Sequence, residues 1–321
     1  MNVIEVTNLK RDYVTNVGVL KREKKTVNAL KGITFNVHKG EIFGLLGPNG
    51  AGKTSTIKIL TTLLTPTSGD AKVLGYNCFG DEKFLRKRIN FIFGGERSLY
   101  WRLSAWDNLS YFCDLYGIDE KIKKERIEQL LKLVGLSDKA HYKVESFSKG
   151  MKQRLQIARG LVNDPEVLFL DEPTIGLDPL GAKTLRDIIK QLSKEGKTIV
   201  LTTHYMHEAD ELCDRIAVIN KGELIALDKP ENLKKDMDSS VIELKISNYD
   251  NNLLQLIRSI NNITNISVKE LEDGHMVSIS CRAARNTIAS INEKLSDYKI
   301  LSMGMRETTL EDVYINMIEG E

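Results

Sequence analysis

Long apolar runs are absent from this sequence of 321 residues. No stretch approaches the roughly 18 consecutive apolar residues that a membrane-spanning helix requires. The first residues, Met1–Val6, also lack the basic and apolar pattern of a secretory signal peptide. We therefore expect the chain to be cytoplasmic and to take any role at a membrane through a partner.

Cysteine is scarce, and the four cysteines lie far apart without a CxxC pair. This spacing disfavours a disulfide or metal framework and fits a reducing cytoplasm. Neither charge sign is in excess, because 46 basic and 44 acidic residues leave a net charge of +2. The overall charge therefore gives no reason to expect nucleic acid as a direct partner. The length suits two domains of ordinary size.

One strongly specific motif is present, because Gly47–Thr54 fits the phosphate-binding pattern G-x-x-x-x-G-K-[ST]. The apolar run before it, residues 41–46, predicts a buried strand, and residues 54–64 predict a one-sided helix after it. Glycines let the backbone wrap around phosphates, and a helix N-terminus attracts anions. The predicted nucleotide-binding residues of this loop are Gly47, Pro48, Asn49, Gly50, Ala51, Gly52, Lys53, Thr54 and Ser55.

An apolar run followed by two acids, Asp171 and Glu172, predicts the second half of such a site. We expect Thr54 and Asp171 to hold Mg²⁺, and Glu172 to orient the attacking water. His204 ends the next predicted strand, residues 198–203. Because ligands bind beyond the carboxyl ends of parallel strands, His204 should lie at the same edge. Glu172 and His204 are the predicted catalytic residues.

Three further patterns are weaker evidence for a nucleotide site. Tyr13 lies upstream of the loop, where its ring either stacks on adenine or is an ordinary partly buried tyrosine. Ser148 precedes a predicted helix that extends to about residue 162, and a capping serine there makes a second phosphate-binding helix start. The acids and histidines of residues 204–211 do not match H-E-x-x-H, which favours a phosphate-sensing His204 beside a surface helix.

An aromatic-rich segment spans residues 91–116 and contains both tryptophans of the chain, Trp101 and Trp106. Such density is typical of an interaction surface, since these rings give large contact area at low entropic cost. The alternative is the core of a small helical subdomain, and the two interpretations are compatible.

The pattern of elements predicts two domains. Residues 3–6 and 33–37 suit strands, and the basic run at residues 21–25 between them predicts a solvated loop. Residues 1–230 form the first domain, and the polar residues 231–240 a linker. Residues 241–321 follow the order strand, helix, strand, strand, helix, strand, which predicts a small α+β domain.

Taken together, the motifs over residues 2–228 resemble the ATP-binding subunit of an ATP-binding cassette (ABC) transporter. Phe147–Met151 resembles the family signature, Gly176–Asp178 resembles the D-loop, and His204 matches the switch histidine. The resemblance implies an α/β P-loop NTPase with a mostly parallel core sheet, an antiparallel subdomain and a helical subdomain at about residues 95–163. It implies ATP and Mg²⁺ as cofactors, with further nucleotide contacts from Ser148, Gly150 and Asp178.

The resemblance also implies partners: a separate transmembrane permease subunit, and a second cassette, identical or different, that closes head to tail. The chain would then be peripheral at the inner face of the cell membrane. The small C-terminal domain is similar to one in exporters of drugs, antibiotics or other hydrophobic cargo. The alternative is an ABC ATPase that acts on ribosomes or nucleic acid, but the single cassette without a long coiled coil favours transport.

Two positions depart from the family pattern. Gly95 stands where the family has a glutamine that helps to hold Mg²⁺ and water, and Glu96 follows it. Met151 stands where the signature ends in glutamine. Because Glu172 and His204 are retained, we expect an active ATPase.

Overall fold

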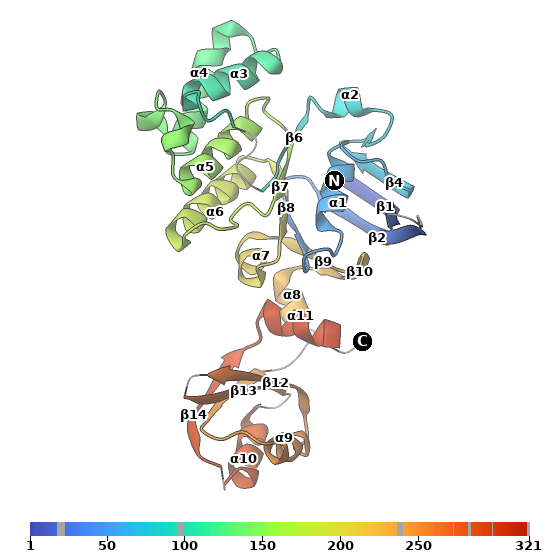
Figure 1. Cartoon of the computed structure of the whole chain (residues 1–321), viewed down its shortest axis with the longest axis vertical. Coiled ribbons are helices and arrows are strands. Elements are labelled where there is room, and N and C mark those ends of the chain that lie inside the picture. Colours follow the sequence, from blue (N-terminus) through green and yellow to red (C-terminus); the bar gives the residue numbers. More distant parts are fainter. Residues whose placement is uncertain are drawn as a thin grey trace. The chain divides into compact units, whose positions relative to one another are not determined.

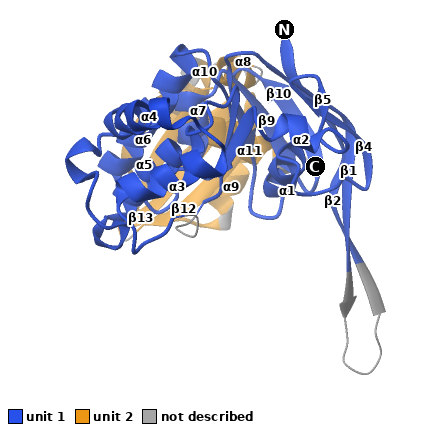
Figure 2. Cartoon of the chain, turned by 90° about the horizontal axis from the view of Figure 1, so that it is seen from above, with its two compact units in different colours: residues 1–229 blue, residues 230–321 orange. Residues whose placement is uncertain are grey.

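The structure is a computed structural model that describes residues 1–17, 23–94, 99–235, 240–271, 273–281, 284–296 and 298–319. The chain forms two compact units, Met1–Lys229 and Pro230–Glu321 (Figure 2). Residues 230–235, which we predicted to be mostly linker, instead form helix α8 (Pro230–Lys235). A proline begins this helix, and its buried residues are Pro230 and Leu233. The segment is too short to show helical periodicity. The rest of the predicted linker up to residue 239 lies outside the described residues.

A six-stranded, mostly parallel sheet forms the centre of the first unit (Figure 1). Every residue of its two middle strands is buried, as expected of parallel strands covered on both faces. Only the last strand, β10, is antiparallel to its neighbour. In sheet order the strands are β10 (Glu223–Asp228), β9 (Arg215–Asn220), β3 (Ile42–Leu46), β8 (Thr198–Thr203), β7 (Val167–Asp171) and β6 (Ile89–Ile92).

A second, antiparallel sheet has the order β2-β1-β4-β5. Its strands are β1 (Asn2–Val17), β2 (Glu23–His38), β4 (Ser68–Val73) and β5 (Tyr76–Asn77). Helix α1 (Lys53–Leu60) lies between the two sheets, and its buried side chains share one core with both. This core fixes the start of α1 against the end of β3.

Strands β1 and β2 are much longer than predicted, because they pair from Asn2 with His38 to Val17 with Glu23 (Figure 2). The predicted solvated loop is therefore wrong at residues 23–25, which belong to β2, whereas residues 21 and 22 lie outside the described residues. At Val14 and Val27 the side chains are exposed. A two-stranded ribbon exposed in this way lacks the alternation of apolar and polar residues by which a half-buried strand is predicted.

Helices α5 and α6 cover the face of the central sheet opposite α1 (Figure 1). Helix α5 also packs against α3 and α4, which form the helical part of this unit. The helices of the first unit, besides α1, are α2 (Glu82–Leu85), α3 (Ala105–Leu115), α4 (Glu120–Leu133), α5 (Lys149–Gly160), α6 (Pro179–Lys194) and α7 (Met206–Leu212). Both sheets and the helical part agree with the predicted fold class.

The second unit is a four-stranded antiparallel sheet with the order β12-β13-β11-β14. Helices α9 and α10 pack on one face through an apolar core. This is the split β-α-β arrangement. The elements are β11 (Ser240–Ile246), α9 (Asn251–Arg258), β12 (Ile263–Leu271), β13 (Gly274–Cys281), α10 (Ala284–Lys294) and β14 (Ile300–Glu307).

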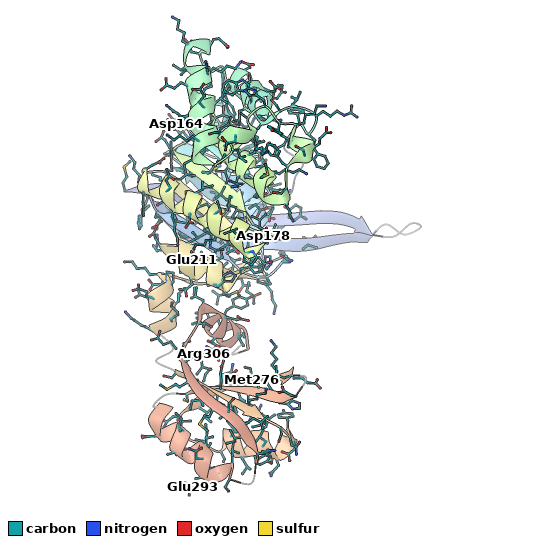
Figure 3. The ribbon with its side chains drawn as sticks, turned by 90° about the vertical axis from the view of Figure 1, so that its left-hand side faces the viewer. Asp164, Asp178, Glu211, Met276, Glu293 and Arg306 are labelled. Carbon is teal, nitrogen blue, oxygen red and sulfur yellow. The ribbon has the colours of Figure 1, made fainter. Side chains whose placement is uncertain are left out.

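A final helix, α11 (Leu310–Glu319), was not predicted from the sequence. Arg306 on β14 fixes its start, donating to Asp312 at 2.6 and 2.9 Å and to Glu243 on β11 at 2.7 Å (Figure 3). Burial acts to raise the pKa of Asp312, but the hydrogen bonds from Arg306 and Thr309 together outweigh it and lower the pKa. Within the described residues, no helix is both long and apolar enough to cross a membrane.

Candidate functional site

The glycine-rich loop leaves the N-terminus of α1 open toward solvent. Gly52 precedes the helix with a left-handed φ of 112°, and it has no side chain to cap the first N–H groups. A Cβ atom at Gly52 would lie 2.6 Å from the carbonyl oxygen of Ala29, so only glycine fits there. The uncapped N–H groups and the helix dipole therefore form a site suited to phosphate.

Lys53 places a cation inside this loop. Its side chain is only 5% exposed, and Nζ donates to the carbonyl oxygens of Gly47 at 2.7 Å and Pro48 at 3.1 Å. Burial lowers the pKa of Lys53, while the nearby carboxylates of Glu172 and Asp171 act in the opposite direction. Nζ lies 4.0 Å from Oε1 of Glu172, so the cation stands between the loop and the acidic strand end.

Asp171 and Thr54 meet at the end of β7. The hydroxyl of Thr54 lies 3.2 Å from each carboxylate oxygen of Asp171, and the hydroxyl of Thr202 donates to Oδ1 at 2.5 Å. Hydroxyl and carboxylate oxygens are the ligands that Mg²⁺ prefers. The donor set present at this strand end therefore fits the predicted metal.

Glu172 adopts a strained backbone with φ at 50°. Its N–H donates to the carbonyl oxygen of Thr202 at 3.1 Å and to the hydroxyl of Thr202 at 3.0 Å, which holds it against β8. Oε1 of Glu172 lies 3.0 Å from Nδ1 of His204. The structure thus brings together Glu172 and His204 beside Lys53, as the sequence order of strands suggests.

Tyr13 lies on β1 opposite Val27 of β2 and contacts α1. Its hydroxyl is 3.1 Å from the hydroxyl of Ser55, and the guanidinium of Arg11 is 4.8 Å from the centroid of its ring. The ring is partly buried and adjoins the phosphate loop. This position is compatible with base stacking, and the stacking itself stays a prediction.

Ser148, Gly150 and Asp178 form a separate group in this chain. Ser148 caps α5 and accepts a hydrogen bond from the N–H of Met151 at 3.2 Å, while a Cβ atom at Gly150 would meet open space. Asp178 caps α6 by accepting from Gly181 at 2.6 Å (Figure 3). Helices α5 and α6 lie across the sheet from α1 (Figure 1). The contacts of these residues with nucleotide stay a prediction.

Some relevant residues were not predicted, and others lie outside the described residues. Thr202 was missed, although parallel pairing places it directly beside Asp171. Glu208 was expected on a surface helix, but its side chain is buried and bonded to two threonines. Gly95 and Glu96 lie outside the described residues. In the parts of the chain that are described, no group of three histidines, cysteines or acids is placed to hold a metal.

The aromatic segment is partly a core and partly a surface. Tyr100, Trp101 and Tyr111 are between 44% and 47% exposed, whereas Leu109 and Cys113 on the same helical part are fully buried. The ring of Trp101 lies 4.5 Å from Nζ of Lys152 on α5. Exposed rings beside a buried scaffold agree with both interpretations of this segment.

Comparisons with known proteins place these features in context. Residues 30–175 match the family described as ABC transporter. The chain is 36% identical over 318 residues to the linearmycin resistance ATP-binding protein LnrL of Bacillus subtilis (strain 168), with 98% of each chain covered. It is 47% identical over 208 residues to a fluoroquinolones export ATP-binding protein of Mycobacterium tuberculosis, covering 64% of this chain and 67% of that one. The dimeric ATP-binding cassette MJ0796, solved in a post-hydrolysis state bound to ADP and Pi, matches at 26% identity with a TM-score of 0.62, covering 70% of this chain and 98% of that chain.

Proposed function

This chain belongs to the family of ABC transporter ATP-binding proteins, and we propose that it powers the export of a drug, antibiotic or other hydrophobic cargo through a separate membrane subunit. The observation that supports ATP hydrolysis best is the meeting of Lys53, Asp171, Glu172 and His204 at one sheet edge. The similarity to a linearmycin resistance protein over nearly the whole of both chains favours export over action on ribosomes or nucleic acid.

Binding of ATP uses the loop and the start of α1. The uncapped N–H groups of this helix and the Nζ atom of Lys53 stabilise the negative charge of the phosphates. Lys53 gives up its hydrogen bonds to the loop carbonyls when it turns to the outer phosphates. Tyr13 supplies a ring on which adenine stacks, with Ser55 close to it.

Thr54 and Asp171 would hold Mg²⁺, because their oxygens already converge at the end of β7. When bound, this ion neutralises charge on the β and γ phosphates. Thr202 keeps the carboxylate of Asp171 in place by donating to Oδ1.

Glu172 acts on the attacking water. Its carboxylate accepts a hydrogen bond from the water, orients it in line with the γ phosphate and takes up its proton. His204 lies at Oε1 of the same carboxylate, where it fixes the side-chain orientation and reaches the phosphate side of the site. Both groups sit at strand ends, so the sheet limits their movement.

Two cassettes close head to tail in this proposal, with Ser148 and Gly150 of one facing the γ phosphate held by the other. ATP favours the closed state because it binds to two helix N-termini only there. The cassette acts as a peripheral subunit at the inner face of the cell membrane, where closure moves the membrane subunit.

Substitution of Lys53 by alanine tests the proposal. Lys53→Ala should weaken nucleotide binding and abolish hydrolysis, because the outer phosphates lose their buried cation. Phosphate release by the purified chain with Mg-ATP measures turnover, and fluorescent nucleotide titration measures binding. Undiminished ATPase activity in Lys53→Ala would contradict the assignment of the site.

A resistance assay tests the export function. It compares the drug resistance of cells that express the chain together with its membrane subunit with that of the same cells carrying Lys53→Ala.

A further inference from the structure

Glu208 is a carboxylate enclosed within the first unit. Its residue is only 1% exposed, and it lies on α7, which follows His204 in the chain. Oε1 accepts a hydrogen bond from the hydroxyl of Thr174 at 2.7 Å, and Oε2 accepts one from the hydroxyl of Thr203 at 2.6 Å. A buried carboxylate is costly unless its oxygens are hydrogen-bonded, so both bonds matter to the folded state.

The two threonines belong to the two segments that carry the predicted catalytic residues. Thr203 directly precedes His204 and also accepts the N–H of Tyr205 at 3.0 Å. Thr174 follows Glu172 by two positions, and its carbonyl oxygen accepts the N–H of Leu177 at 3.1 Å. One carboxylate thus connects the strand end before His204 to the turn after Glu172.

This bridge is a second connection between the two segments, in addition to the direct contact of Glu172 and His204 at 3.0 Å. The backbone of Glu172 is strained, with φ at 50°, and a strained residue keeps its conformation only where its surroundings determine it. The N–H of Glu172 donates to the hydroxyl and the carbonyl oxygen of Thr202, which fixes the start of the turn. The Thr174–Glu208–Thr203 bridge fixes the turn two residues further along the chain.

We propose that Glu208 is a positioning residue for ATP hydrolysis, which holds Glu172 and His204 in register through Thr174 and Thr203. The inference rests on the proposed ATPase function of the same site. Displacement of a reacting group by about 1 Å can cost about a hundred-fold in rate, so a small shift of this turn should affect turnover. ATP binding should be nearly unaffected, because α1 and its loop are outside the bridge.

Hydroxyl deletion in the two threonines tests the bridge. Thr174→Val and Thr203→Val keep the shape of the side chain and remove one donor each. We expect kcat to fall about ten-fold or more in each, with the Kd for ATP within about two-fold of wild type. Thr174→Ser and Thr203→Ser keep the hydroxyl and should restore kcat to within about three-fold. Glu208→Gln keeps the volume but replaces one acceptor by a donor, and it should also lower kcat.

Two matched controls separate positioning from stability. Thr61 is 2% exposed, and its hydroxyl donates to Ile57 within α1, so Thr61→Val should lower the unfolding temperature without lowering kcat. Glu211 lies on the same helix as Glu208 but pairs with Arg186 and Lys190, so Glu211→Gln should leave kcat unchanged.

The possible results are distinguishable. Wild-type kcat in both valine variants would overturn the inference alone, as would serine variants that are as slow as the valine variants. A kcat that falls only in proportion to lost folded protein in thermal unfolding would also overturn it. Absence of ATPase activity in the wild-type chain would overturn the proposed function, and this inference with it.

Discussion

Glu172 combines a strained backbone with two hydrogen bonds to the neighbouring strand, and this combination determines where its carboxylate points. Its φ of 50° is uncommon for a residue with a side chain. The hydroxyl and the carbonyl oxygen of Thr202 both accept the N–H of Glu172, so β8 keeps this strained backbone in place. The carboxylate then lies within 3.0 Å of His204 and 4.0 Å of Lys53.

Replacement of Glu172 by glutamine should separate binding from chemistry. Glutamine has nearly the same shape but is a far poorer base. Glu172→Gln should therefore bind ATP as wild type does and hydrolyse it roughly a hundred-fold or more slowly. Single-turnover hydrolysis and nucleotide titration measure the two quantities. A wild-type rate in this variant would move attention to Glu96 as the catalytic carboxylate.

The sequence predicted the positions in the fold of the residues whose type and spacing form motifs, whereas their roles stay predictions. Lys53, Thr54, Asp171 and His204 all lie where strand ends and a helix start were expected. Glu208 could not be predicted in this way. Its proposed role depends on Thr174, which is distant in sequence, and on Thr203, whose side chain is buried. Neither threonine belongs to a periodic pattern.

At the scale of elements, Asp164 ties three parts of the first unit together (Figure 3). It accepts from Nζ of Lys197, next to β8, at 2.5 Å and from the guanidinium of Arg126, on α4, at 3.2 Å. Burial acts to raise the pKa of Asp164, but hydrogen bonds from Lys197 and Arg126 outweigh it and lower the pKa. The carboxylate therefore joins the helical part to the central sheet.

Removal of the charge of Asp164 should lower the free energy of unfolding of the first unit, by an amount that depends on pH. Asp164 has φ at 50°, which asparagine tolerates, so Asp164→Asn tests charge rather than backbone strain. Because the side chain is 67% exposed and solvent screens its charge, the free energy of unfolding at pH 7 should fall by at most about 1 kcal/mol.

The sign of the pH effect follows from the lowered pKa of Asp164. The stabilisation is present above the unfolded-state pKa of about 3.9 and disappears as pH falls through the lower folded-state pKa. Urea unfolding of wild type and Asp164→Asn should therefore differ at pH 7 and converge only when the pH has fallen below the lowered folded-state pKa. The exposed Asp138 provides the control, since Asp138→Asn should not alter the pH dependence. A difference that persists in acid would contradict the ionic explanation.

The aromatic segment gives a second test at this scale. Trp101 is 47% exposed, and its ring contacts Lys152 on α5, the helix that Ser148 caps. We expect Trp101→Ala to reduce co-purification with the membrane subunit while the basal ATPase rate stays close to wild type. Tyr142, 53% exposed but outside this segment, supplies the control variant Tyr142→Ala. If Trp101→Ala fails to fold, the ring serves as a core residue instead.

At the scale of the whole molecule, predictions from the sequence succeeded where an element carries a clear run or pattern of apolar residues that become buried. The central strands and the order of elements in the C-terminal sheet belong to this class. Short or exposed elements were missed. Helix α8 has a single buried leucine, α11 depends on the ion pairs of Arg306, and the outer half of the β1–β2 hairpin exposes Val14 and Val27. Each of these depends on contacts that local periodicity does not encode.

The separation of Ser148 from the phosphate loop makes a prediction about association. Ser148 caps α5, which lies on the opposite side of the central sheet from α1 (Figure 1), so we expect it to reach the γ phosphate of a second cassette. In the Glu172→Gln background, Mg-ATP should convert the chain to a dimer on size-exclusion chromatography, alone or with its partner cassette.

Ser148→Arg should abolish this dimer, since a bulky cation would crowd the phosphate contact. The substitution also removes a helix cap worth about 1 kcal/mol, so thermal unfolding must show that the chain stays folded. The exposed Ser137 of the same helical part provides the matched control, because Ser137→Arg adds the same side chain away from the cap of α5 and should leave the dimer intact. A dimer that persists in Ser148→Arg would show that association does not use the N-terminus of α5.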